Sequence, residues 1–315
     1  MNDVKGEDGY GFCTQSGIAV ICDGASGFHK DFDENDNLVP IKDLTDGDVT
    51  SAKAWADKLT KYMLSGLKKG MSLEKALKQA IADATKCFPL KNRDFKKFQT
   101  PSATIIAIRV TEDGFEAIGS GDCGMLLDFG GGNVLSIVED KVLPAIRAKR
   151  EASIHEAYPN FDNLKKEKQA TIRYRFMQQT RESLGSYNGG YFVPYYGGAE
   201  KMDDFMQTFQ KAEGKYVTIT SYGRGDIWTL KAKSVKSVLI SSDGFLKKVL
   251  QCKLVKFDDL ISKAKTSGYL SELGKELRGL EKNLIDVSVQ VVKAVNGQPD
   301  TGSADDATAL FFEII

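Results

Sequence analysis

Acidic residues recur beside the apolar segments of this chain, in positions that could support chemistry. Some follow an apolar segment next to a glycine, and others stand just before one: Asp23, Asp122, Asp243, Glu7, Asp8 and Asp305. Any single Asp-Gly pair is explained as well by a turn. If the apolar segments are neighbouring strands of a sheet, however, their ends bring the carboxylates together. The collection, rather than any one member, therefore indicates a site.

The other residue types determine which chemistry such a site would perform. The sequence has only two histidines, His29 and His155, and its five cysteines include no C-x-x-C pair. This argues against a zinc site and against a disulfide framework. Carboxylate oxygens suit Mg²⁺ and Mn²⁺. Two such ions held about 3.5–4 Å apart can share a bridging water, lower its pKa and stabilise an in-line displacement at phosphorus.

Composition excludes several classes of protein. The chain has 315 residues, of which 42% are hydrophobic and 27% charged, so it can bury a core and is not disordered as a whole. Lysine plus arginine equals aspartate plus glutamate, 43 against 43, which leaves no global field for nucleic acid or membranes. No apolar run reaches the roughly 18 residues that span a bilayer. Without a signal pattern, we expect reduced cysteines and a cytoplasmic protein, with delivery into another cell left open.

Hydrophobic periodicity predicts the elements that would position the acids. Amphipathic helices are expected over residues 49–67 and 72–88, and a largely helical segment over 254–295. Residues 28–47 are acidic and are expected to form a loop. Short strands are expected at 10–14, 18–22, 102–110, 115–118, 124–129, 134–138, 216–220, 227–230, 235–241 and 307–315. Helices grouped between blocks of strands favour an α+β fold with antiparallel sheets.

The middle of the chain is expected to be an insertion. We predict a single domain over residues 1–315 with a helical and flap-like insertion at about 145–215. Residues 145–184 are polar, basic in part and helical in pattern, and they could guide acidic phosphopeptides or simply form a solvated face. Residues 185–198 are rich in glycine, tyrosine and proline. They are expected to be a loop that either faces substrate or packs its aromatic side chains on the body.

The order of these motifs resembles the metal-dependent protein phosphatases of type 2C, the PPM family. The two predicted helices fall in the gap where that family has two helices, and the resemblance spans nearly the whole chain. The motifs that carry it are Glu7-Asp8, Asp23-Gly24, Ser102-Ala103-Thr104, Gly121-Asp122-Cys123, Ser242-Asp243-Gly244 and Asp305-Asp306-Ala307-Thr308. The resemblance implies two packed antiparallel β-sheets flanked by helices, an α-β-β-α sandwich.

The resemblance also implies roles for the acids. By motif match, Asp23 would bridge two Mg²⁺ or Mn²⁺ ions, with the carbonyl of Gly24 as a further ligand. Asp243 and Asp305 would bind the first ion. Glu7 would bind the second ion directly or through water. A metal-bound hydroxide would then attack the phosphorus of phosphoserine or phosphothreonine without a covalent enzyme intermediate.

Two further acids have more peripheral roles in the resemblance. Asp8 would orient metal-bound water and so serve catalysis together with Asp23. Asp122 would match an acid that helps to hold a third, weaker ion in many bacterial members. Many members also carry a carboxylate four residues after the aspartate of S-D-G, whereas this chain has Lys247 there. That departure puts the third ion in question.

Other departures concern the phosphate and the leaving group. Many members carry an arginine that grips the substrate phosphate five residues before the aspartate of E-D, but this position is Asp3 here. Lys5 or another cation would have to substitute. Eukaryotic members often follow D-G with a histidine, whereas Ala25 and Ser26 follow here. His29 is nearby in sequence and is a minor candidate for the general acid.

Three functions remain open from the sequence. The first is a signalling phosphatase that acts on phosphoproteins as a monomer, with no nucleic-acid or membrane partner. The second is a catalytically inactive type 2C-like protein that serves as a binding module, which the departures at Asp3, Ala25 and Lys247 would explain. The third is another two-metal phosphohydrolase that acts on a nucleotide or a small phosphoester.

Overall fold

The structure is a computed structural model of the whole chain. It describes residues 7–25, 27–28, 30–35, 37–41, 50–88, 96–112, 114–137, 142–185, 192–223, 225–251, 254–277 and 308–314, with the backbone alone at 142–144, 247, 250–251 and 257–258. The chain divides into two compact units. The first unit contains Met1–Cys123 and Glu139–Ser234, and the second contains Gly124–Val138 and Val235–Ile315.

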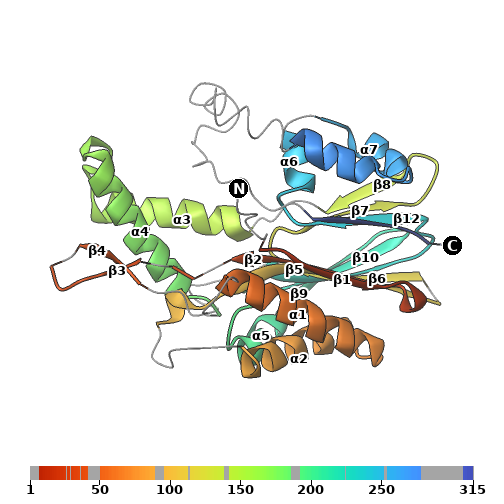
Figure 1. The fold of residues 1–315 in the computed structure, drawn as a ribbon, viewed down its shortest axis with the longest axis horizontal. Helices are drawn as coiled ribbons and strands as arrows, with labels where there is room; N and C mark the ends of the chain where they lie inside the picture. Colours follow the sequence, from red (N-terminus) through yellow and green to blue (C-terminus); the bar gives the residue numbers. More distant parts are fainter. Residues whose placement is uncertain are drawn as a thin grey trace. The chain divides into compact units, whose positions relative to one another are not determined.

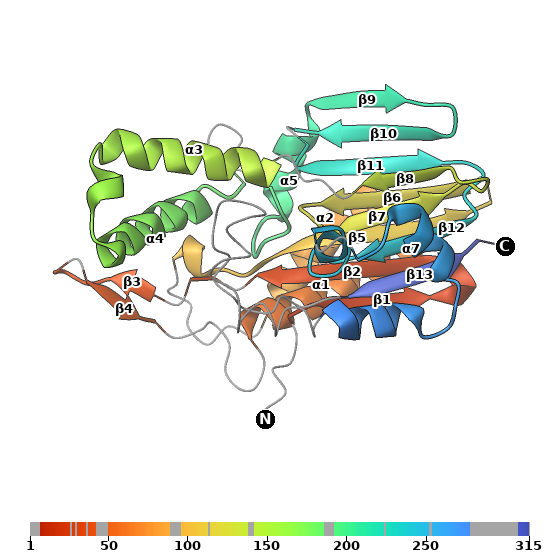
Figure 2. The same cartoon turned by 90° about the horizontal axis from the view of Figure 1, so that it is seen from above.

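A seven-stranded antiparallel sheet forms the centre of the first unit (Figure 2). Its strands, in spatial order, are β1 (Gly9–Cys13), β2 (Ile18–Ala25), β5 (Ser102–Thr111), β6 (Gly114–Ser120), β11 (Ile227–Ala232), β10 (Val217–Tyr222) and β9 (Phe209–Glu213). In β2, β5 and β6, apolar residues on both faces of the sheet are buried, whereas the residues of β10 are only partly buried. The strands predicted from the sequence over 10–14, 18–22, 102–110, 115–118, 216–220 and 227–230 are all present.

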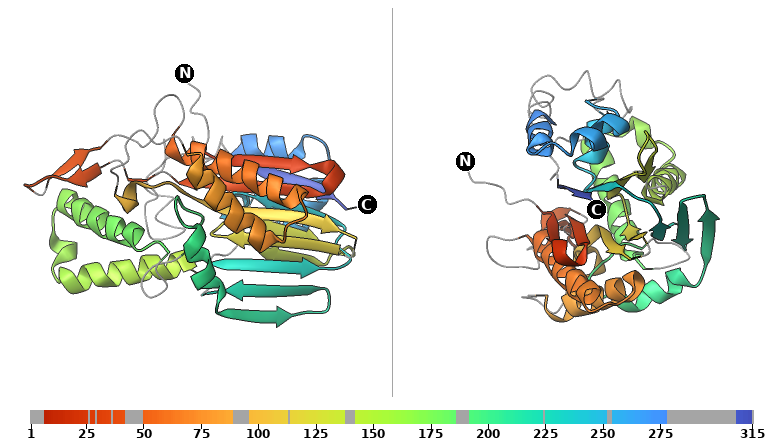
Figure 3. Two further views of the ribbon diagram at one scale, coloured as in Figure 1. Left: turned by 90° about the horizontal axis from the view of Figure 1, so that it is seen from below. Right: turned by 90° about the vertical axis from the view of Figure 1, so that its right-hand side faces the viewer.

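Two helices cover one face of this sheet (Figure 3). They are α1 (Ser51–Lys68) and α2 (Leu73–Lys86), close to the predicted 49–67 and 72–88. Each begins at a hydroxyl N-cap, because Thr50 accepts a hydrogen bond from the amide of Lys53 and Ser72 accepts one from the amide of Lys75. Their apolar stripes pack on alternate residues of β2 and β5 to form the main core.

The predicted loop over 28–47 is partly wrong, because it contains a short hairpin. Strands β3 (Lys30–Phe32) and β4 (Leu38–Pro40) pair in antiparallel fashion. The Asp33 side chain closes the turn by accepting hydrogen bonds from the amides of Asn35 at 2.9 Å and Asn37 at 2.8 Å. The acidic and amide residues that indicate a loop in the sequence therefore form the turn of this hairpin.

The segment predicted as an insertion contains a helical pair, α3 (Val142–Ala157) and α4 (Lys166–Glu182), where the sequence predicts helices (Figure 1). Beyond it, the described part of the aromatic loop packs on the core of the first unit. Phe192, Val193 and Tyr195 are buried, and Tyr195 forms an isolated bridge to Ser102. For residues 192–198, the packed alternative is confirmed.

Two elements of the insertion are absent from the predicted pattern. Helix α5 (Ala199–Met206) and edge strand β9 follow the aromatic loop. All five residues of β9 are exposed, so no apolar alternation marks it. An edge strand with solvent on both faces has no reason to alternate, and β9 is defined by its pairing with β10 alone.

The second unit contains a four-stranded antiparallel sheet with helices packed on it. Its strands, in spatial order, are β13 (Ala309–Glu313), β12 (Ser237–Ser241), β7 (Gly124–Asp128) and β8 (Val134–Ile137). Helices α6 (Leu246–Gln251) and α7 (Phe257–Lys263) and the helical residues 269–277 bury their apolar side chains in one cluster with Leu126 and Leu239. The helix predicted over 254–295 is interrupted at Gly268, whose φ of 84° is left-handed, and its part from residue 278 lies outside the described residues.

The fold-class prediction is confirmed: the protein is α+β, and all its named strands pair in antiparallel fashion. The single domain with an insertion at 145–215 stays a prediction. No helix among the described residues combines the length and apolarity that crossing a membrane requires.

A row of charges across the seven-stranded sheet gives a first testable prediction. Glu116 on β6 lies opposite Arg109 and Lys231, and it binds them at 2.7 and 3.2 Å. Burial raises the pKa of Glu116, but the hydrogen bonds from both cations outweigh it, so that the pKa is lowered overall. The ionised form therefore contributes stability above the unfolded-state pKa, and this contribution is lost as the pH falls through the folded-state value.

We expect Glu116→Gln to lower the free energy of unfolding at pH 7 by about 1 kcal/mol. The difference from the wild type should shrink at acidic pH, as the pH falls through the lowered pKa of Glu116 and the carboxylate becomes protonated. Urea unfolding at neutral and at acidic pH measures this. A difference that is equal at pH 7 and pH 3 would contradict the electrostatic explanation.

Candidate metal centre

The strand register places two of the predicted acids side by side. Gly9 of β1 pairs with Cys22 of β2, so Asp8, one residue earlier, lies opposite Asp23, one residue later. On the other side of β2, Asp23 pairs with Thr104 of β5. Asp8, Asp23 and Thr104 therefore form a row across one end of the sheet.

These three side chains share a face of the sheet. The neighbours Cys22 and Ile105 belong to the core beneath α1 and α2, and a Cβ on Gly9 would meet the backbone of Ala56 in α1. Because side chains alternate along a strand, Asp8, Asp23 and Thr104 point to the opposite face. Asp8 is nevertheless buried, with 7% exposure. Burial of one carboxylate beside another favours a bound cation.

Close backbone packing fixes the positions of Asp8 and Asp23. A Cβ on Gly24 would lie 2.7 Å from the carbonyl oxygen of Glu7 and 2.8 Å from that of Ala52. Glycine is therefore required where β2 passes between the Glu7-Asp8 segment and the start of α1. In addition, the Nζ of Lys53 donates a hydrogen bond to the carbonyl oxygen of Asp8 at 2.7 Å. Lys53 was not among the residues predicted from the sequence, because no motif includes it.

This packing predicts the effect of a single added methyl group. Gly24→Ala should lower the free energy of unfolding by about 1–3 kcal/mol, because backbone atoms must shift to accommodate it. It should also weaken Mn²⁺ binding, since the shift moves Asp8 and Asp23 apart. Thermal unfolding and calorimetry measure the two effects. Gly214→Ala, at an exposed site with no contact under 3.4 Å, is the control; equal behaviour of the two variants would contradict the prediction.

Asp122 reaches the same end of the sheet through a tight turn. Gly121 has a φ of 87°, and a Cβ on it would lie 2.2 Å from Cγ2 of Thr104. The turn brings the Sγ of Cys123 within 3.2 Å of the Oγ1 of Thr104. Only glycine can make this turn against Thr104.

The pKa of the Cys123 thiol reflects the negative charge of the acids around it. Burial raises the pKa of Cys123 well above its usual value, and the negative charges of Asp23, Asp122 and Asp8 raise it further. Burial likewise raises the pKa of Cys22 to about 12, with added repulsion from Asp8 and Asp23. Both thiols therefore stay protonated, as expected for packing residues. The structure thus brings Asp8, Asp23 and Asp122 into one electrostatic neighbourhood.

In the second unit, Asp243 lies two residues beyond the end of β12. The preceding Ser242 is buried and holds the start of the last strand twice: its amide donates to the carbonyl oxygen of Thr308, and its Oγ accepts from the amide of Thr308, both at 3.0 Å. This fixes the backbone next to Asp243. Asp305 lies outside the described residues, as do Asp3, Lys5, Ser26 and His29 and the side chain of Lys247.

The oxygen atoms described in the first unit are of the type that a hard divalent cation takes as ligands. Asp8 and Asp23 are in-register carboxylates on one face, with the backbone of Gly24 and Glu7 beside them, and oxygen donors are what Mg²⁺ and Mn²⁺ take. Over the described ranges, no group of three or more histidine, cysteine, aspartate or glutamate residues is arranged to hold a metal ion. The described part of the set is thus a carboxylate pair rather than a closed coordination sphere.

Solved structures similar to this chain are bacterial phosphatases. They include a bacterial serine phosphatase (14% identity, TM-score 0.43, 98% of this chain and 91% of that one). Others are the catalytic domain of PstP in complex with two manganese ions (12%, 0.41, 99% and 92%) and Stp1 of Staphylococcus aureus (15%, 0.41, 99% and 90%). At these identities and scores, the likeness carries no argument about activity. No protein-family model and no curated protein matches the sequence.

Proposed function

We propose that this protein is a metal-dependent phosphatase that hydrolyses phosphoserine and phosphothreonine in proteins. The observation that carries the proposal is the in-register pair of Asp8 and Asp23 at one end of the seven-stranded sheet. Both residues belong to motifs whose order along the chain resembles that of the type 2C family. The resemblance adds Glu7, Asp122, Asp243 and Asp305 to the set of metal ligands.

Each residue of the pair has a distinct part in the proposed reaction. Asp23 and the carbonyl of Gly24 would bind Mg²⁺ or Mn²⁺ at the end of β2. Two bound metal ions would lower the pKa of the water that they share and would stabilise the charge that develops on the phosphoryl group. Asp8 would accept a hydrogen bond from the attacking water and so orient it toward phosphorus. The burial of Asp8 would keep bulk water from competing for that bond.

A phosphoprotein substrate is proposed because a cluster of lysines lies at the start of α4. Lys165, Lys166 and Lys168 on α4 and the loop before it are exposed. An exposed cluster of cations raises the association rate of acidic peptides. Other basic residues of α4 are engaged within the protein, since Arg173 pairs with Glu151 and Arg175 lies over the ring of Phe32.

The test is hydrolysis of a phosphothreonine peptide with Mn²⁺ and with EDTA. We expect turnover only with the metal, and loss of turnover in Asp243→Asn. Asp259→Asn, an exposed aspartate of α7 in the same unit, is the matched control and should retain wild-type activity. A parallel assay with an aryl phosphate and a nucleotide would show whether small phosphoesters are preferred.

Each alternative function predicts a different result. Mn²⁺ binding by calorimetry without turnover of any substrate would favour the inactive binding module. Faster hydrolysis of the nucleotide than of the phosphopeptide would favour a small-molecule phosphohydrolase. Absence of both turnover and metal binding would contradict the proposed function.

A further inference from the structure

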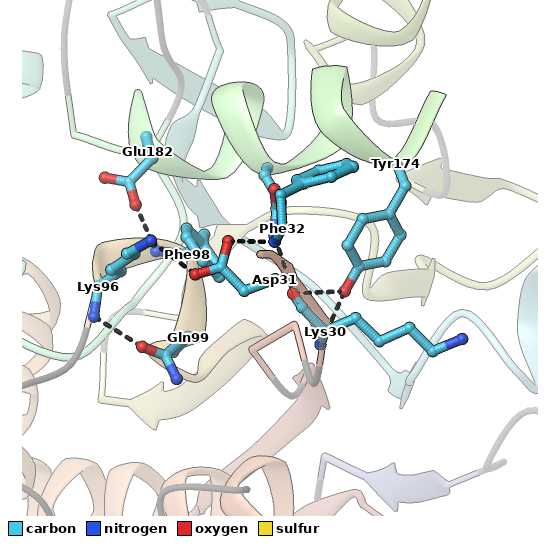
Figure 4. A network of polar contacts seen from close by, with 9 residues as sticks. Lys30, Asp31, Phe32, Lys96, Phe98, Gln99, Tyr174 and Glu182 are labelled. Carbon is cyan, nitrogen blue, oxygen red and sulfur yellow. Dashed lines mark hydrogen bonds and ion pairs between the residues drawn. The ribbon is translucent and has the colours of Figure 1, made fainter. Parts of the chain in front are cut away.

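Side chains of the second half of α4 form hydrogen bonds with main-chain groups of other segments in the first unit (Figure 4). The hydroxyl of Tyr174 donates to the carbonyl oxygen of Lys30 and accepts from its amide, both at 3.1 Å. The Nε2 of Gln178 donates to the same carbonyl at 2.9 Å. The Oε1 of Glu182 accepts from the amide of Phe98 at 3.0 Å. One face of α4 thus contacts the backbone of Lys30 and of Phe98, which lie in separate parts of the chain.

Arg181 on this face contacts the ends of two strands at once. Its Nη2 donates to the carbonyl oxygen of Thr100 at 2.9 Å and to that of Ala25 at 3.3 Å. Ala25 is the last residue of β2, and Thr100 precedes β5 by two residues. Thr100 is buried, with 2% exposure, so its carbonyl depends on partners within the protein.

The contact lies next to the candidate metal centre along both strands. Ala25 pairs with Ser102, and two pairs further along the ladder Asp23 pairs with Thr104. The two segments that leave the strands also run close together, because the amide of Phe28 donates to the carbonyl oxygen of Phe98 at 3.0 Å. A guanidinium that holds both strand ends therefore restrains the backbone from which Asp23 projects.

We propose that Arg181 is a positioning residue that couples the helical insertion to the metal-binding end of β2. It acts through the backbone of Ala25 and Thr100 on the orientation of Asp23. The inference rests on the proposed function, since Asp23 is there a metal ligand. It assigns the insertion a part in assembling the metal centre, in addition to any contact with substrate.

The chemistry of the side chain explains why arginine suits this position. A guanidinium is planar, permanently charged and rich in donors, so one group can bind two carbonyls in a fixed geometry. Lysine presents a point charge on a flexible stem and would hold one carbonyl well. Glutamine removes the charge and shortens the reach. The series from arginine through lysine to glutamine should therefore lower metal affinity in steps.

The experiment compares Mn²⁺ binding by calorimetry in the full-length protein and its variants. Arg181→Gln should weaken Mn²⁺ binding about tenfold, the lower end of the range for residues that support metal ligands, and Arg181→Lys should fall between it and the wild type. Gln178→Ala loosens the same helix without touching Ala25 or Thr100, and it should bind Mn²⁺ as the wild type does. Lys149→Gln, an exposed lysine of α3, controls for the change in charge.

Kinetics separate positioning from substrate binding. At limiting Mn²⁺, phosphopeptide turnover by Arg181→Gln should fall, whereas at saturating Mn²⁺ its KM for the peptide should match the wild type. The inference about Arg181 would be overturned by unchanged Mn²⁺ binding in Arg181→Gln, or by an equal loss of Mn²⁺ affinity in Gln178→Ala. In either case, turnover by the wild-type protein would still support the proposed function. A wild-type protein that neither binds Mn²⁺ nor hydrolyses phosphopeptide would overturn both.

Discussion

Asp23→Asn is expected to lower kcat for phosphothreonine-peptide hydrolysis by about a thousandfold, equivalent to about 4 kcal/mol of transition-state stabilisation. Asparagine keeps the shape of the side chain and one carbonyl oxygen, but it removes the negative charge. The fold should tolerate the change, because Asp23 is only partly buried and its strand pairing uses the backbone. Removing one of several clustered acids should even relieve repulsion in the metal-free protein.

The control for this variant is Asp162→Asn, whose side chain is 79% exposed on the insertion. We expect it to retain wild-type kcat and Mn²⁺ affinity. The prediction is measured by steady-state kinetics at saturating Mn²⁺, together with thermal unfolding without metal. Activity of Asp23→Asn within tenfold of the wild type would show that Asp23 is not a ligand on which turnover depends.

Trp55→Ala is expected to have the largest effect on stability, about 3–5 kcal/mol in the free energy of unfolding. Trp55 on α1 is fully buried, and its ring lies edge-on to Phe88 and Tyr196 at centroid distances of 5.8 and 6.1 Å. Its Nε1 also donates to the carbonyl oxygen of Pro194 at 3.2 Å. The substitution therefore leaves a cavity and removes the hydrogen bond that holds the aromatic loop.

Trp55→Phe separates these two contributions. It keeps an aromatic ring in the core but loses the donor to Pro194, so it should cost about 1–3 kcal/mol, less than the alanine variant. Urea unfolding measures both variants. A cost for Trp55→Ala under 1 kcal/mol would contradict the packing described here.

Much of the fold follows from local sequence signals. The stripes from Ala52 to Met63 and from Leu73 to Ala84 are periodic, and hydroxyl caps at Thr50 and Ser72 start both helices. Asp122 and Asp243 each lie two residues beyond a strand, as acids beside glycine often do. Asp23 and Gly24 instead lie within β2, which continues to Ala25. That Asp8 and Asp23 are adjacent, however, is a matter of register, which the hairpin around Gly17 sets.

Other features depend on tertiary contacts that leave no local signal. Strand β9 exists through pairing alone, and the β3–β4 hairpin is hidden within an acidic segment. The role of Arg181 is likewise invisible in the sequence, since it is one cation among several on α4 and only the fold brings Ala25 and Thr100 to it. The tight packing of Gly24 against Glu7 and Ala52 requires the helix and the strand to be in place.

The most direct test of the proposed metal centre is Mn²⁺ binding followed by electron paramagnetic resonance. We expect two Mn²⁺ ions per chain, with the spin-coupled spectrum of a pair held about 3.5–4 Å apart. Asp23→Asn should abolish the coupling, because it removes the carboxylate that we propose to bridge the two ions. Two uncoupled ions, or a coupled pair that survives in Asp23→Asn, would contradict the assignment of Asp23 as the bridging ligand.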